Sequence, residues 1–276
     1  MQARLATIQD HGQLTKFYSC YYPSGHPLYN QNFWAWMFTN PAYGQCIVVE
    51  NEAKEIIGHM GCIQAGGLVW LVNILVDTNY RKQNIPDILF DAARHFGPLA
   101  VAVANDAGAS LLRRKKWHEQ PLLQRWIWTR PNTDFQNDPD FFTTKQPPVG
   151  LQKPNGYLWQ QPHLQSVAFS WGDIAQLALS AGGLRLVTCN DPKACVAWAM
   201  EHGCNWIDFV TSDTNASMQI ALQVALFFQH ENFPWYLNPP DFSRKVTLNW
   251  FTENPLPEGF IFDRSMADMT RIGSID

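Results

Sequence analysis

The run Leu68–Val76 constrains the fold most, because it is apolar at almost every position. A strand that is apolar on both faces must be covered on both faces, as in the middle of a sheet flanked by helices. A short loop follows this run. After it, the segment Pro86–Phe96 places its apolar residues on one stripe of a helix. Only Asn73 interrupts the run. The pattern predicts a buried strand, a loop and an amphipathic helix in direct succession.

The same alternation of strand and helix patterns continues along the chain. We expect strands at Arg4–Thr7, Cys46–Glu50, Glu55–Ile63, Leu99–Ala104, Leu123–Thr129, Leu184–Thr188, Trp206–Thr211, Val246–Phe251 and Gly259–Asp263. Further helices are expected at Ile8–Cys20, Gln31–Thr39, Ala107–Lys116, Pro192–His202 and Asn215–Gln229. Strands that alternate with helices indicate an α/β fold with a mixed sheet and helices on its faces.

A segment rich in Pro, Asn, Asp and Gln, residues 131–156, divides the chain. It lacks sustained periodicity, so we interpret it as a linker or wrapping loop between domains at 1–130 and 157–276. Val103–Trp117 and Phe209–Phe227 share an order of strand, short Asp/Asn turn and helix. The second domain is therefore interpreted as a degenerate repeat of the first, and such an internal repeat favours a monomer.

Composition narrows the class of protein. The net charge of −4 argues against nucleic acid as a partner, because such a surface is normally basic. The first ten residues carry no apolar signal core, and no apolar run is long enough to span a membrane. The six cysteines form no Cys-x-x-Cys pair, which is typical of reduced thiols. We expect a cytoplasmic protein that acts on small molecules.

The loop between the buried strand and the amphipathic helix has the composition of a phosphate site. Asn84 tolerates a left-handed backbone, and Pro86 suits the first turn of a helix. Backbone N–H groups that converge at a helix N-terminus bind phosphate, and Arg81 and Lys82 add positive charge. The alternative is an ordinary loop with two solvated basic residues.

This loop resembles the signature of the GNAT acyltransferase superfamily. That signature is a strand ending in Val, then an aromatic residue, then Arg-x-x-Gly-x-Gly/Ala. Val76, Tyr80, Arg81 and Ile85 match it, Asn84 stands for the first glycine, and Pro86 for the last small residue.

The flanking sequence extends the resemblance to about Trp128. The segment Arg4–Asp10 resembles the opening strand and helix of the family, and Ile57–His59 the turn of its central hairpin. The fold class implied is a GNAT-like first half followed by a degenerate GNAT-like second half that helps to form the acceptor site.

The resemblance implies an enzyme that transfers an acyl group from acyl-CoA to an amine, with coenzyme A as co-substrate and no metal. It places the cofactor against Leu75, Val76, Arg81, Lys82, Gln83, Asn84, Ile85 and Asn105. The backbone N–H of Ile74 would stabilise the oxyanion of the thioester. Leu112 stands where the family often has a tyrosine that protonates the thiolate, so that role is vacant here or is filled from elsewhere in the chain.

Three polar residues are further catalytic candidates. Asn73 could orient the amine, whereas His59 or Asp106 could accept its proton. Each has a structural alternative. Asn73 could be a buried amide bonded to backbone, His59 an exposed hairpin residue, and Asp106 the cap of a helix.

The acceptor is predicted from the aromatic residues and the C-terminus. Tyr21, Tyr22 and Trp34 lie in the region that borders the acceptor site in this superfamily, with core packing as the alternative. The tail that contains Asp268 resembles two-part members that acylate dTDP- or UDP-linked amino sugars for surface polysaccharides. We therefore expect a nucleotide-linked amino sugar. One alternative is another small amine as acceptor, such as an amino acid or an aminoglycoside. The other is a protein that binds CoA without catalysing transfer.

Overall fold

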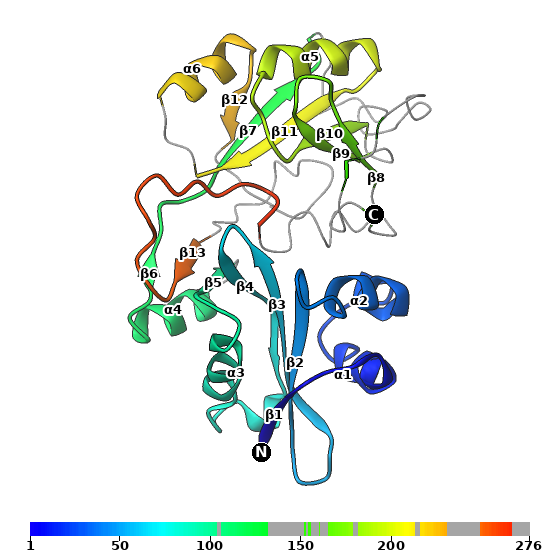
Figure 1. The fold of residues 1–276 in the computed structure, drawn as a ribbon, viewed down its shortest axis with the longest axis vertical. Coiled ribbons are helices and arrows are strands. Elements are labelled where there is room, and N and C mark those ends of the chain that lie inside the picture. The colour runs from blue at the N-terminus through cyan, green and yellow to red at the C-terminus, as the bar shows by residue number, and fades with distance from the viewer. Residues whose placement is uncertain are drawn as a thin grey trace. The chain divides into compact units, whose positions relative to one another are not determined.

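The computed structural model describes residues 1–103, 106–131, 152, 154–155, 160, 165–178, 182–212, 216–230 and 249–266. These residues form two compact units, each built on its own sheet (Figure 1). The first unit holds the described residues of 1–120 and 250–256 together with Met266, and the second those of 121–249 and 257–265. The predicted α/β class with mixed sheets is confirmed.

The first sheet has seven strands in the order β1-β2-β3-β4-β5-β13-β6. Their bounds are β1 Gln2–Leu5, β2 Gly44–Glu50, β3 Ile56–Ala65, β4 Leu68–Val76, β5 Leu99–Val103, β6 His118–Glu119 and β13 Asn249–Thr252. Neighbours from β1 to β4 are antiparallel, whereas β4 and β5 are parallel. Because β4 lies in the middle of this sheet, its apolar run is explained.

Helices cover both faces of this sheet. On one face lie α1 (His11–Tyr18) and α2 (Gln31–Phe38), and on the other α3 (Ile85–Arg94) and α4 (Asp106–Arg114) (Figure 1). Short 3₁₀ turns stand at Ile8–Asp10 (η1), Pro27–Tyr29 (η2) and Thr78–Tyr80 (η3). The α3 face is mostly aliphatic, with Leu71, Leu89 and Val101 in its core. The α1 and α2 face is aromatic, and Tyr18 and Trp34 are both fully buried there.

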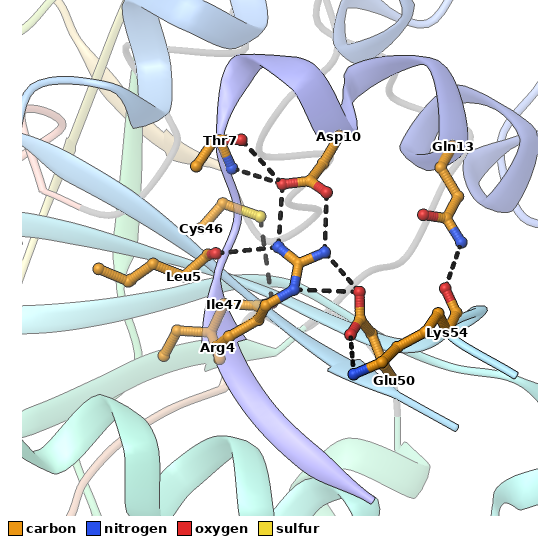
Figure 2. Close-up of polar contacts among 9 residues, drawn as sticks. All are labelled: Arg4, Leu5, Thr7, Asp10, Gln13, Cys46, Ile47, Glu50 and Lys54. Carbon is orange, nitrogen blue, oxygen red and sulfur yellow. Dashed lines mark hydrogen bonds and ion pairs between the residues drawn. The ribbon is translucent and has the colours of Figure 1, made fainter. Parts of the chain in front are cut away.

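The Arg4 side chain, in β1, forms hydrogen bonds with η1 and with β2 (Figure 2). Its guanidinium donates two hydrogen bonds to the Asp10 carboxylate, at 2.8 and 2.9 Å, and its Nε donates to Glu50 Oε1 at 3.0 Å. The bond from Arg4, despite partial burial, lowers the pKa of Asp10 to about 2. One side chain thus joins β1, η1 and β2, which fixes where α1 begins.

The second sheet has six strands in the order β12-β7-β11-β10-β9-β8. Their bounds are β7 Gln124–Thr129, β8 Gln165–Ala168, β9 Ile174–Ala178, β10 Gly183–Leu186, β11 Trp206–Thr211 and β12 Phe228–His230. Helices α5 (Pro192–Glu201) and α6 (Ala216–Val224) pack on one face (Figure 1). Strands β10 and β11 are parallel and the other pairs are antiparallel.

The pairing of two strands differs from the predicted division at residue 130. Strand β7, which the sequence analysis places in the first domain, pairs with β11 and β12 of the second sheet. Strand β13 lies between β5 and β6 of the first sheet. The expected strand Gly259–Asp263 was wrong, because only Asp263 forms an isolated bridge, with Thr211. Helix α6 ends before the predicted Gln229 because Leu226 adopts a left-handed backbone, with φ at 66°.

Candidate functional site

One edge of β4 is open near its C-terminal end. Strand β3 pairs with β4 as far as Val76. On the other side, β5 pairs only with Val69–Leu71, through Leu99–Val101. Among the described residues, the remainder of β4 has no strand partner on that side. The two parallel strands therefore diverge, and main-chain groups of β4 are left without ladder partners.

The direction of these main-chain groups follows from the pairing with β3. The Asp77 N–H donates to the Ile57 carbonyl at 2.9 Å, and Leu75 stands opposite His59. Because successive residues of a strand direct their N–H and C=O groups to opposite sides, Ile74 and Val76 face the open edge. Leu75 faces β3, so the prediction that its backbone binds the cofactor was wrong. Tyr21 Oη donates to the Val76 carbonyl at 3.1 Å, and so occupies one acceptor of this edge.

The open edge begins at a β-bulge centred on Asn73. The register of β3 against β4 shifts between His59 and Gly61, and Asn73 has φ at 52°. Asn is one of the few non-Gly residues that tolerate this backbone. Its Nδ2 donates to Tyr22 Oη at 3.0 Å, and its Oδ1 has no hydrogen-bond partner among the described residues. The predicted buried amide bonded only to backbone is therefore replaced by a side chain shared with an aromatic hydroxyl.

His59 is fully buried beside this bulge, so the structural alternative, an exposed hairpin histidine, does not hold. Its Nδ1 lies 2.9 Å from the Asn73 carbonyl oxygen, and its Nε2 lies 2.8 Å from Tyr18 Oη. Burial lowers the pKa of His59 to about 4, which keeps the ring neutral. Both ring nitrogens are engaged, so His59 does not meet a substrate directly as a general base.

The aromatic candidates divide into two kinds. Trp34 is fully buried and its Nε1 donates to Tyr18 Oη at 3.1 Å, so its assignment to substrate binding was wrong and the core-packing alternative holds. Tyr21 and Tyr22 are half-buried. The Tyr22 ring stacks on His26 at 3.9 Å between centroids. Both tyrosines reach β4, one through the Val76 carbonyl and the other through Asn73.

The loop after β4 has the backbone that the sequence predicts. Asn84 is left-handed, with φ 56° and ψ 21°, and it precedes α3 directly. Among the described residues, no acceptor contacts the backbone N–H groups of Lys82, Asn84 or Ile85. The side chains of Arg81, Lys82 and Gln83 are exposed, and neither basic residue forms an ion pair with a described residue. The loop presents free N–H groups and positive charge at a helix N-terminus.

Close packing under this loop depends on Gly58. A Cβ placed there would lie 2.6 Å from Ile85 Cγ2, at the first residue of α3. The segment Ile57–His59 is thus part of β3 rather than the predicted hairpin turn. The signal that could have revealed this is the glycine itself, because a strand glycine often marks a close approach.

The other candidates are less connected to this edge. Asp106 is exposed in the first turn of α4. Leu112, at the position of the family's tyrosine, is buried in the aliphatic core at 2% exposure. Asn105 and Asp268 lie outside the described residues.

The described part of the chain has neither a cluster of metal-binding side chains nor a helix suited to cross a membrane. In the described part of the chain, no group of three or more His, Cys, Asp or Glu side chains is placed to hold a metal ion. No described helix is long and apolar enough to cross a membrane.

Comparisons with known proteins bear on the fold alone. No family model matches the chain, and no curated protein matches its sequence. A putative acetyltransferase from Pyrococcus horikoshii superposes with a TM-score of 0.53 and 11% identity, over 92% of this chain and 89% of that one. A tandem GNAT protein from the clavulanic acid biosynthesis pathway gives a TM-score of 0.46 and 12% identity, over 93% and 99%. A GNAT-family acetyltransferase from Staphylococcus aureus gives 0.37 and 16%, over 43% and 85%. The Pyrococcus likeness extends across both units and establishes the fold.

Proposed function

We propose that this chain is an acyl-CoA-dependent N-acyltransferase whose acyl site lies along the open edge of β4. One observation carries the proposal: the open edge runs directly into a loop with a left-handed residue, in which the N–H groups of Lys82, Asn84 and Ile85 and two basic side chains have no partner among the described residues. A pantetheine arm needs main-chain partners in an extended line, and a diphosphate needs converging donors at the end of that line. The two features follow each other in that order here.

The residues present fit such a co-substrate. The N–H and C=O of Ile74 and the N–H of Val76 face the open edge, where they can pair with amide groups. The N–H groups of Lys82, Asn84 and Ile85, with the Arg81 side chain, can bind a diphosphate. The Val76 carbonyl is excluded from this set by Tyr21. Pro86 lacks an N–H and offers no donor.

Acyl transfer to an amine needs no covalent intermediate on the protein. The chain must hold the neutral amine against the thioester carbon, and such positioning lowers a barrier by about 7–11 kcal/mol. The Ile74 N–H is placed to stabilise the oxyanion, and a single well-aimed donor contributes roughly 3–4 kcal/mol. Asn73 and Tyr22 lie beside this N–H and can orient the amine. With His59 enclosed, Asp106 remains the exposed carboxylate among the predicted proton acceptors.

For the acceptor we propose a nucleotide-linked amino sugar of the kind used in surface polysaccharides. Support comes from Tyr21 and Tyr22, two half-buried rings held next to β4 that offer surfaces for a base or sugar. Trp34 no longer supports this choice, because its ring is enclosed in the core. The two remaining tyrosines suit other amines of similar size equally well, including amino acids and aminoglycosides.

The experiment has two stages. Calorimetric titration with CoA and acetyl-CoA tests the acyl site, and the absence of binding would refute the proposal. Thiol release is then followed with dTDP- and UDP-linked amino sugars, amino acids, aminoglycosides and peptides. Release with an amino sugar supports the acceptor, whereas release only with another amine replaces it. Binding without release from any amine would favour a silent CoA-binding module.

A further inference from the structure

A chain of buried hydrogen bonds ends on the bulge of β4. Its members come from α2, α1 and β3: Trp34, Tyr18 and His59. All three side chains are fully buried, and the bonds between them are buried as well, whereas the last bond, to the Asn73 carbonyl, is partly buried.

Each bond in this chain has only one possible direction. A neutral histidine carries one N–H, and a carbonyl oxygen can only accept. His59 Nδ1 must therefore donate to the Asn73 carbonyl, which leaves Nε2 as an acceptor for the Tyr18 hydroxyl. The Tyr18 oxygen in turn accepts from the Trp34 indole. Tyr18, whose oxygen already accepts from Trp34, donates to Nε2 and so stabilises the tautomer of His59 that can hold the carbonyl.

The bulge explains why this carbonyl needs a side-chain partner. The extra residue in β4 shifts the register between His59 and Gly61, and no residue of β3 is paired with Asn73 there. A carbonyl that is partly withdrawn from water gains from a donor within the fold. His59 stands in β3 at the register shift itself and supplies one from its ring.

The same peptide unit carries the proposed oxyanion donor. The Asn73 C=O and the Ile74 N–H belong to one planar peptide group and point in opposite directions. A bond that holds the carbonyl toward His59 therefore sets the direction of the N–H at the open edge. We propose that His59 is a positioning residue that aims the Ile74 N–H at the thioester carbonyl, with Tyr18 stabilising the required tautomer. This inference rests on the proposed acyltransferase function.

A matched pair of variants separates the hydrogen bond from residue 59 to the Asn73 carbonyl from the packing of the His59 ring. In His59→Asn, the side-chain amide nitrogen stands close to the place of Nδ1 and retains a donor for the Asn73 carbonyl. In His59→Gln, the amide nitrogen stands close to the place of Nε2 and this donor is lost. Both remove the ring, so both lower the melting temperature. Tyr18→Phe removes the donor to Nε2 and serves as a third variant.

The readout is the infrared band of the thioester carbonyl in bound acetyl-CoA, labelled with carbon-13. A hydrogen bond from Ile74 lowers its frequency relative to acetyl-CoA in water-poor solvent. We expect this shift in the wild type and in His59→Asn, and its loss in His59→Gln. With the amine found in the acceptor screen, kcat should fall by about 10- to 100-fold in His59→Gln, with the KM for acetyl-CoA little changed. The infrared shift and the kcat of Tyr18→Phe should lie between those of His59→Asn and those of His59→Gln.

The outcomes distinguish this inference from the function on which it rests. If the wild type does not bind acetyl-CoA, the proposed function fails. If the wild type binds and shows the shifted band, but His59→Gln shows the same band and the same kcat, the positioning role is overturned. Equal losses in His59→Asn and His59→Gln would also overturn it, because the ring would then act through packing alone.

Discussion

Substitution of Gly58 by alanine should disturb the packing of α3 on β3 and thereby weaken binding at the proposed acyl site. The added Cβ would lie 2.6 Å from Ile85 Cγ2 and 3.4 Å from Val49 Cβ. The first distance is well short of van der Waals contact, so either α3 moves away from β3 or Ile85 leaves its rotamer. Overpacking of this kind costs about 1–3 kcal/mol. The loop proposed to bind phosphate ends at Ile85, so we expect weaker CoA binding as well as lower stability.

The assay is urea unfolding, with the midpoint and the slope compared between wild type and Gly58→Ala. Gly12→Ala is the matched control, because Gly12 lies in α1 and a Cβ there meets nothing within 4 Å. That control should gain about 0.5–1 kcal/mol, as expected for alanine in a helix, with CoA affinity unchanged.

A double-mutant cycle with Ile85→Ala tests the cause. Ile85→Ala alone should cost about 2–5 kcal/mol, because Ile85 is fully buried. The alanine at 85 lacks Cγ2, so the two substitutions should together cost less than the total of their separate effects by at least about 1 kcal/mol. Strict additivity would refute the reasoning, since the clash at 2.6 Å would then not be the source of the loss.

Three further predictions concern Arg81 in the loop after β4, the buried His59, and the ion pair between Arg4 and Asp10. Arg81→Ala should raise the KM for acyl-CoA more than it lowers kcat, because a phosphate contact stabilises ground and transition states alike; steady-state kinetics checks this, with Lys16→Ala, at an exposed lysine of α1, as control. His59 has a pKa of about 4 in the fold against an ordinary 6.5, so the unfolded chain binds a proton between these values that the fold does not. The free energy of unfolding should therefore fall as pH drops through this window, by at most about 3 kcal/mol, and His59→Asn should remove that part of the slope. Asp10→Asn should cost about 1 kcal/mol above pH 3.8, a modest value because the Arg4 side chain is 36% exposed. The wild type loses this advantage as pH falls from 3.8 toward 2, where Asp10 protonates, so the two unfolding curves should converge there.

Local sequence chemistry predicted the backbone of β4 and of the loop after it well. The buried strand Leu68–Val76 was predicted with the observed bounds, because a continuous apolar run needs no knowledge of its partners. The left-handed Asn84 followed from the tolerance of asparagine for that backbone and its place before a helix. Both depend on a few adjacent residues, and local physics decides them.

Side-chain environments were predicted poorly where they depend on distant segments. His59 reads locally as a polar residue between two glycines near a turn, yet α1 and α2 cover it completely. Tyr18 was not recognised, because its hydroxyl acquires a role only when His59 and Trp34 come within reach. The bulge at Asn73 had one visible signal, an amide inside an apolar run, but its left-handed backbone depends on the register with β3.

The division into domains failed to follow from the sequence for a related reason. Both β7 and β13 were recognised approximately as strands, but a strand pattern does not state which sheet it joins. Strand β13 enters between β5 and β6, where Trp250 stacks on the fully buried Trp70 at 5.8 Å. Strand β7 enters between β11 and β12 in the second sheet. A chain cut at residue 130 would therefore lack the strand that covers Trp70 and retain an apolar strand without its sheet. Each sheet is complete only with strands from both sides of residues 131–156, so the composition of that segment does not by itself mark the end of a folding unit.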